Sequence, residues 1–260
     1  MDRPIVYPNA LVTDTDTLTL AKAAEVGLAF AMQAVMGTST VVDGLSCTPG
    51  SGLAVSVGAG SIYALLEADP TAYGSLGIDT GLIVKQGLSR AVTTLSTPAP
   101  STAGQSIDYL IEAQYQDADS GPELLAYYDS ANPSVPFTGP GGDGQAQNTL
   151  RQGLCVLQVK AGTAAATGSQ TAPAADAGWV GLWVVSVTNG QSAIVSGDIA
   201  EAPGAPFLAT KLPQALSTLG GTVTGALTVD GTLNAAGGLS AASGTVSGNL
   251  TVDGAIEGGS

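Results

Sequence analysis

The sequence predicts a mainly β protein with three parts: an N-terminal arm carrying a single α-helix, an antiparallel β-sandwich or barrel, and a C-terminal repetitive β-shaft in a homotrimer. Helical spacing of apolar residues occurs before residue 37, the apolar pattern then takes a period of two, and the last forty residues contain an internal repeat. Many short strands without alternating helices are typical of sandwiches and Greek-key barrels. We place the boundaries at residues 1–40, 41–204 and 205–260.

The first part is expected to be an extended arm followed by one helix. Alternating Thr and Asp at residues 13–16 suit a helix N-cap, and Gly37 suits the C-terminal cap. Apolar residues recur every three or four positions between these caps: Leu18, Ala21, Ala24, Leu28, Met32 and Val35. Val26 and Phe30 lie on a different side, so two sides of the helix are apolar. We expect the β-domain to cover one side and a neighbouring subunit or another protein to cover the second.

The central part shows a series of short apolar stretches bounded by Gly, Pro, Asn or Asp, the pattern of antiparallel strands. The predicted strands are Leu53–Val57, Ser61–Leu65, Gly81–Gln86, Ala91–Leu95, Ile107–Gln116, Glu123–Tyr128, Gly153–Lys160, Trp179–Thr188 and Ala193–Ile199. Two longer segments, Asn132–Gln147 and Thr163–Gly178, are rich in small residues and are predicted to be loops that are mobile unless a partner orders them.

The C-terminal part contains an internal repeat: Val223–Leu233 returns 23 positions later as Val246–Ile256, with seven of eleven residues identical. No aromatic residue occurs from Leu212 to Ser260, so this segment has little bulk with which to form a core of its own. Short strands with Asp-Gly turns would expose unpaired edges, which sister chains wound about a common axis would cover. Three copies suit a symmetric shaft best, although the period does not distinguish three copies from two.

The residues expected to pack the shaft are the larger apolar ones of the repeats. They are Leu227, Val229, Leu233, Leu239, Val246, Leu250, Val252 and Ile256. The alternative interpretation is that they form an ordinary strand core within one subunit.

Composition excludes several classes of function. A net charge of −14 with only seven Lys and Arg residues argues against a nucleic-acid partner, which needs clustered cations. The absence of histidine removes the commonest general base and metal ligand. The N-terminus lacks an export signal, and no run of about 18 apolar residues would span a bilayer, so we expect synthesis in a host cytoplasm without membrane insertion. Cys47 and Cys155 are interpreted as two buried free thiols rather than one long-range disulfide.

Acidic and glycine-rich segments offer weak signals for chemistry. Asp117–Glu123 carries three carboxylates around a glycine, but lacks the remaining ligands of a calcium loop and is predicted to be a hairpin turn. Asp129 and Asp143 could form a glycosidase-type pair, but solvated loop acids are the preferred interpretation. Gly139–Gly144 lacks the Lys-Ser/Thr of a phosphate loop. We therefore expect no catalysis, no cofactor and no metal.

Three stretches of the sequence resemble the N-terminal portion of tail-fibre proteins from tailed bacteriophages and prophages. They are Met1–Pro8, Thr102–Asp117 and Ala174–Gly190, and the likeness covers roughly residues 1–200. The resemblance implies a trimeric fibre whose N-terminal region docks on the tail tip or baseplate and whose distal part meets the host surface. The chain stops at Ser260 without a bulky terminal domain, so the distal part is either missing from this chain or supplied by another protein.

The favoured function is therefore that of a structural virion component anchored through residues 1–40. We assign docking to a set of apolar residues: Pro4, Ile5, Val6, Tyr7, Leu18, Leu28 and Phe30. The first alternative is a carbohydrate-binding adhesin that contacts host glycans through the loop at 132–147 or through exposed aromatic residues. The aromatic candidates, which otherwise serve as core or interface residues, are Tyr115, Tyr127, Tyr128, Trp179 and Trp183. A depolymerase is a third, disfavoured alternative, because no convincing acid/base pair is present.

Overall fold

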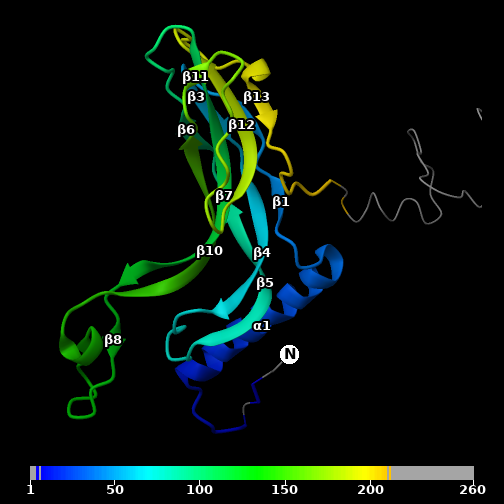
Figure 1. Cartoon of the computed structure of the whole chain (residues 1–260). Coiled ribbons are helices and arrows are strands. Elements are labelled where there is room, and N and C mark those ends of the chain that lie inside the picture. Colours follow the sequence, from blue (N-terminus) through cyan, green and yellow to red (C-terminus); the bar gives the residue numbers. More distant parts are fainter. Residues whose placement is uncertain (1–3, 6, 210, 212–260) are drawn as a thin grey trace, which may run out of the picture. The chain divides into compact units, whose positions relative to one another are not determined.

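The computed structural model describes residues 4–5, 7–209 and 211 of the chain (Figure 1). These residues belong to a compact unit that spans Met1–Leu212. The unit is mainly β, with one α-helix and a large curled sheet that forms a half-barrel, which confirms the predicted mainly β class. The predicted shaft and all of its packing residues lie outside the described residues, as does Val6.

The helix, α1, spans Asp14–Met36 and has the ends that the sequence predicts. Thr13 is the N-cap: its backbone N–H donates to the Asp16 carboxylate at 2.8 Å, and its hydroxyl accepts from the Asp16 N–H at 3.4 Å. Gly37 ends the helix with a φ of +80°, and its N–H donates to the Gln33 carbonyl. Local sequence therefore fixes both ends of α1.

The large sheet has the strand order β1-β4-β5-β10-β7-β12-β13, with β11 also paired to β7. Its strands are β1 (Val41–Gly44), β4 (Gly60–Asp69), β5 (Asp79–Ser89), β7 (Gln105–Glu123), β10 (Gln147–Ala161), β11 (Ala165–Ala166), β12 (Val180–Thr188) and β13 (Ile199–Glu201). A second sheet has the order β2-β3-β6, with β2 at Cys47–Pro49, β3 at Ala54–Val57 and β6 at Thr93–Ser96. A third pairs β8 (Ala126–Tyr127) with β9 (Phe137–Thr138), and the short 3-10 helices are η1 (Pro140–Gly142) and η2 (Ser196–Asp198).

The main hydrophobic core joins the two larger sheets. Val55 and Val57 of β3 belong to the same buried cluster as Ile111 of β7 and Val185 of β12, and all four side chains are fully buried. The burial of β3 alternates between partly and fully buried residues, as expected of a strand with one face on the core. In contrast, β7 is buried on both faces from Ser106 to Ala113, which a period of two does not predict.

The tryptophan of β12 closes one edge of this core. The Trp183 indole N–H donates to the Leu45 carbonyl at 2.8 Å, and its ring lies 5.2 Å from the Phe207 ring in a tilted arrangement. The segment that carries Phe207 is held against β1, because the Leu208 N–H donates to the Val42 carbonyl at 2.8 Å. Residues near 207 are thus part of the β-domain, which extends slightly beyond the predicted boundary at residue 204.

Strands β7 and β10 form the longest strand pairing, and this pairing shows that two predictions are wrong. The ladder runs without a turn from Tyr109↔Ala161 to Glu123↔Gln147, so the predicted hairpin turn at Asp117–Glu123 is wrong. The far ends of both strands extend away from the two larger sheets and carry β8 (Figure 1). The predicted strand Glu123–Tyr128 is also wrong, because β7 ends at Glu123 and β8 is only two residues long.

Another predicted strand, Ala193–Ile199, is mostly a turn. Residues 196–198 form η2, and β13 begins only at Ile199. The reason is the Asp198 carboxylate, which accepts from the Val195 N–H at 2.8 Å and from the Gln191 amide at 2.6 Å. Side-chain hydrogen bonds of this kind give the backbone an alternative to the strand ladder.

The predicted purely antiparallel arrangement fails where β5 meets β10, which run parallel with Leu88 opposite Leu154. Two glycines allow the close approach at this point. A Cβ on Gly87 would lie 2.5 Å from the Leu154 carbonyl oxygen, and one on Gly153 would lie 2.6 Å from the Gln86 carbonyl oxygen. Both neighbours are backbone atoms, which cannot move aside without breaking the sheet.

We predict that Gly153→Ala lowers the free energy of unfolding by about 2 kcal/mol or more, because the added methyl group must push β5 and β10 apart. Urea unfolding followed by circular dichroism measures the change. Gly77→Ala is the matched control: nothing lies within 4 Å of the added Cβ, and we expect a change within about 0.5 kcal/mol. Equal stability of the two variants would contradict this account of the strand contact.

Candidate docking surface and the ion-pair cluster beneath it

The inner face of α1 packs on the β4–β5 hairpin through a small apolar contact. Ala29 of the helix forms a buried cluster with Ala68 of β4 and Ile83 of β5, and Val26 packs against it. Across its 23 residues, the helix buries only Ala23 and Ala29. The β-domain therefore covers one side of the helix, as predicted, and leaves most of its apolar side chains in solvent.

The exposed sides of α1 and the arm before it form the candidate docking surface. It consists of large apolar side chains that are each more than half exposed: Ile5, Tyr7, Leu11, Val12, Leu20, Leu28, Phe30 and Val35. Exposed apolar side chains gathered on consecutive segments mark interaction sites more often than scattered ones do. We call this set the N-terminal apolar surface.

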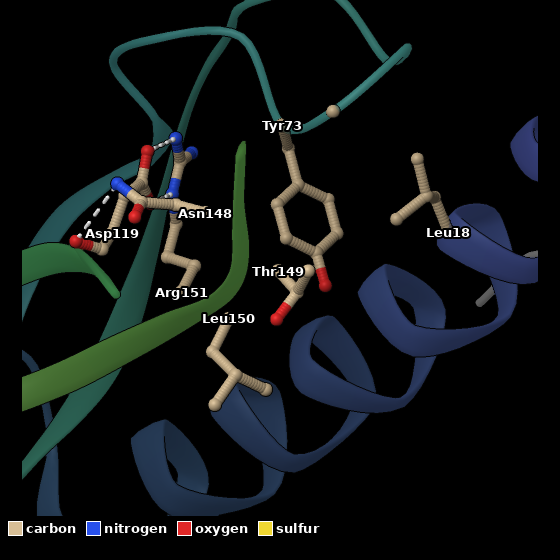
Figure 2. A pocket seen from close by; sticks show the side chains of 8 residues that line it. Leu18, Tyr73, Asp119, Asn148, Thr149, Leu150 and Arg151 are labelled. Carbon is tan, nitrogen blue, oxygen red and sulfur yellow. Dashed lines mark hydrogen bonds and ion pairs between the residues drawn. The ribbon is translucent and has the colours of Figure 1, made fainter. Parts of the chain in front are cut away.

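The structure brings four of the seven predicted docking residues to this surface. Ile5, Tyr7, Leu28 and Phe30 are exposed there, while Pro4 is partly exposed. Leu18 does not belong with them. It is half-buried, and a Cβ on Gly74 would lie only 2.8 Å from its side chain, so Leu18 packs on the loop between β4 and β5 (Figure 2).

Beneath the surface, a cluster of ion pairs connects the helix to both hairpins. Lys22 Nζ of α1 lies 2.9 Å from a carboxylate oxygen of Asp69 and 2.8 Å from one of Asp79, two residues that lie directly opposite each other where the β4–β5 pairing ends. The second oxygen of Asp69 lies 3.3 Å from the Arg151 guanidinium of β10. The Asp69 side chain is only 6% exposed, so little water reaches it. Its carboxylate is shared by two cations, and hydrogen bonds between charged groups of this kind are stronger than those between neutral groups.

Arg151 has the most partners in this cluster. Its guanidinium also binds Asp119 of β7 at 2.7 and 3.0 Å, and it donates to the Thr71 and Ala72 carbonyls at 3.2 and 2.9 Å. The guanidinium carbon lies 5.5 Å from the centre of the Tyr73 ring. Figure 2 shows Arg151 and Asp119 beside Tyr73, at one end of a 170 Å³ cavity that Leu18 also lines. A planar cation with several fixed donors is suited to such a junction.

A third cation, Lys85, lies in the interior next to this junction. Lys85 Nζ donates to the Ala68 carbonyl at 2.7 Å and to the Asp117 carboxylate at 2.6 Å, and its side chain is 1% exposed. The Tyr115 hydroxyl donates to the other oxygen of Asp117 at 2.6 Å. Burial and this carboxylate raise the pKa of Tyr115 far above its usual range. The carboxylates interpreted as a turn thus neutralise cations inside the protein.

Sequence reasoning missed this cluster. Three of the seven Lys and Arg residues, Lys22, Lys85 and Arg151, converge on it. One signal was available: cations are scarce in this chain, and Lys85 interrupts an apolar strand at a position where a solvated lysine would be out of place. Their common location depends on strand pairings far apart in the sequence, which periodicity does not reveal.

The aromatic candidates for sugar stacking have different surroundings. Trp183 and Tyr115 pack against the main core, and Trp179 is partly buried. Tyr127 donates to the Gln147 side chain, and Tyr128 is 76% exposed. A wide groove of about 670 Å³ passes Tyr127, between the start of α1 and the base of the hairpin extension. Tyr127 and Tyr128 therefore remain available to a ligand, whereas Trp183 does not.

The acidic and thiol candidates have local roles. The Asp129 carboxylate accepts from the Ala131 N–H at 2.8 Å, and the Asp143 carboxylate accepts from the Gln145 N–H at 2.9 Å, as in turns that an aspartate stabilises. Among the residues that the structure describes, no three Cys, Asp or Glu side chains are grouped to hold a metal ion. Cys47 and Cys155 are free thiols, as predicted; Cys155 is buried and Cys47 partly so, and burial raises the pKa of each to about 11.

By length and composition alone, α1 is long and apolar enough to cross a membrane. This finding differs from the expectation that no segment meets that criterion. One such helix is weak evidence, and α1 places Lys22 in contact with two carboxylates of the sheet. The absence of membrane insertion stays a prediction.

Comparison with known proteins finds no matching family model, no matching curated protein and no matching solved structure. The likeness to tail-fibre proteins therefore stays a hypothesis carried by the residues quoted for it.

We predict that Arg151→Lys lowers the free energy of unfolding by about 2 kcal/mol, because an ammonium group cannot satisfy Asp69, Asp119 and the loop carbonyls together. Thermal or urea unfolding measures the difference. Lys211→Arg, at an ion pair with Asp43 whose lysine side chain is 57% exposed, is the control and should change stability by less than about 0.5 kcal/mol. An Arg151→Lys variant as stable as the native chain would show that the cluster is dispensable.

Stability should fall in acid through the same cluster. Lys22 lowers the pKa of Asp79 below its ordinary 3.8, and Arg151 lowers that of Asp119. A carboxyl group whose pKa is depressed by folding stabilises the fold above its unfolded pKa, and this contribution is lost as pH falls through the folded pKa. We therefore expect urea midpoints to decrease from about pH 5 to about pH 2, and to decrease less in Lys22→Met, which has already lost the Asp79 partner. An identical acid dependence in the two proteins would contradict the assignment.

Proposed function

We propose that the chain is the virion-proximal part of a trimeric phage tail fibre. In this proposal the N-terminal region attaches to the tail tip or baseplate, the β-domain is a rigid body, and residues 205–260 begin a β-shaft. The observation that carries the proposal is the N-terminal apolar surface, whose side chains on the arm and on the exposed sides of α1 are not covered by the β-domain. Exposed apolar surfaces of this kind mark sites where partners bind.

Two further features support this function. The C-terminal repeat has too few bulky residues for a core within one chain, so sister chains would complete it. The ion-pair cluster ties α1 rigidly to both hairpins, as a protein that transmits force from an anchor to a shaft requires. The role is mechanical rather than catalytic, and rigid display of several copies multiplies weak contacts with a host surface or with a distal fibre protein.

Mass measurement under native conditions tests the trimer. Three chains of 25.4 kDa give about 76 kDa, and this is the expected mass of the full chain in solution. A purely monomeric chain at the concentrations used for assembly would overturn the proposal.

Attachment to a particle tests the anchor. We expect antibodies against the chain to label tail tips in electron micrographs of virions. Leu11→Asp should remove the label, because the Leu11 side chain, 92% exposed in the arm, would bring a charge into an apolar contact. Val195→Asp is the matched control, since Val195 is an apolar residue 58% exposed on the β-domain, and it should leave the label unchanged. If the Leu11→Asp chain still labels tail tips, the arm does not contribute to attachment.

A carbohydrate-binding adhesin is the second candidate, and one observation favours it. The 670 Å³ groove beside Tyr127 is lined by hydroxyl and amide side chains, including those of Gln147, Asn148 and Thr149, and Tyr128 is exposed nearby in the sequence. Such side chains bind sugar hydroxyls, and tyrosine rings can pack on sugar faces. Binding to a glycan array that Tyr127→Ala abolishes, and that Trp183→Phe retains, would favour this function over a purely structural one.

A further inference from the structure

The exposed side of α1 carries a stripe of residues in heptad spacing. Six positions separated alternately by four and three residues are all exposed: Thr17, Ala21, Ala24, Leu28, Ala31 and Val35. Leu28 and Val35 are 55% and 61% exposed, large values for apolar side chains in the middle and last turn of a helix. Alternation of four and three is the spacing by which one helix packs along another. We call these six residues the heptad stripe.

From Ala21 to Val35 the heptad stripe faces away from the residues that hold α1 on the sheet, whereas Thr17 also lines the groove beside Tyr127. Residues that contact the sheet, Lys22, Val26 and Ala29, occupy the outer positions of the same heptad. At about 100° per residue, they lie on average about 145° around the helix axis from the centre of the stripe. The helix can therefore hold its own sheet on one side and meet another helix on the opposite side without rearrangement.

We propose that α1 of one chain packs in parallel against α1 of the other copies, with the heptad stripe along a common axis and the β-domains outside. This inference rests on the proposed trimer and names the surface by which its N-terminal parts meet. It also reassigns Leu28, which the sequence analysis gave to docking on the tail, to contact between copies. The arm residues Ile5, Tyr7, Leu11 and Val12 are left for the tail.

The charge distribution favours another copy of this chain as the occupant. The chain carries a net charge of −14, so most surfaces of two copies repel one another. The heptad stripe contains no charged residue, and no Asp, Glu, Lys or Arg occurs between Val26 and Met36. Alanines at positions 21, 24 and 31 let neighbouring helices approach closely, while Leu28 and Val35 supply apolar contact between them.

A lipid surface is a poorer occupant for the same helix. Helices that lie on membranes carry Lys and Arg on their polar face, where these side chains meet anionic head groups. The only cation of α1 is Lys22, and its ammonium group lies within 3 Å of carboxylates of Asp69 and Asp79. An acidic chain with this helix gains no electrostatic attraction to such a surface.

Disulfide trapping in the full-length chain tests the inference. A disulfide forms when two Cα atoms come within about 7 Å, a distance that equivalent positions along a helix–helix axis can reach. Leu28→Cys should therefore give a covalent dimer on oxidation, seen by electrophoresis without reductant. Phe30→Cys is the matched control: Phe30 is 56% exposed on the same helix but lies outside the heptad stripe, and it should stay uncrosslinked. The native thiols do not compete, because Cys155 is buried and the pKa of each is near 11.

A charge at the axis gives the second measurement. Leu28→Glu should lower the native mass or shift the association midpoint to higher protein concentration, while Phe30→Glu should leave both unchanged. Crosslinking by Leu28→Cys supports the inference even if the Leu28→Glu chain does not fold. A native trimer in which Leu28→Cys stays uncrosslinked, or in which positions 28 and 30 crosslink equally, would overturn the heptad contact and leave the proposed function standing. A monomeric native chain would overturn both.

Discussion

The arrangement of the N-terminal region depends on the carboxylate of Asp69, which is shared between Lys22 of the helix and Arg151 of the hairpin. A carboxylate that is 6% exposed is costly to bury unless its oxygens are paired, and here each oxygen has a cation. The contact thereby fixes three elements, α1, the β4–β5 hairpin and the β7–β10 hairpin, relative to one another. The apolar contact of the helix alone, made by Val26 and Ala29, is small.

This polar attachment explains why so much of α1 is exposed. Because ion pairs hold the inner face, the helix does not need to turn its larger side chains toward the sheet, and Leu28 and Val35 stay in solvent. In the proposed assembly, contact with another copy would bury these side chains. The parallel crossing at Gly87 and Gly153 has a complementary role, because it joins the β4–β5 hairpin to the rest of the half-barrel.

Sequence reasoning succeeded where the signal is local and failed where distant residues decide. The ends of α1 at Thr13 and Gly37 follow from short-range hydrogen bonds and from a φ that glycine readily adopts, so both could be predicted. The segment from Asp117 to Glu123 has the composition of a turn but continues as a strand. Its partners in the ladder are residues 147–153, and its carboxylates pair with Lys85 and Arg151. Neither the strand partner nor the two cations can be predicted from the residues next to it in the sequence.

The sequence by itself determined the mainly β class, the single helix with both caps, the free thiols and the apolar character of the N-terminal region. Each of these is set by neighbouring residues or by overall composition, whose effects act over a few positions of the chain. Only the tertiary structure decided which side of α1 faces the sheet, and that Lys22, Lys85 and Arg151 meet in one cluster. Those features depend on strand pairing across gaps of many residues, where the free energy of burying a charge, rather than local propensity, selects the arrangement.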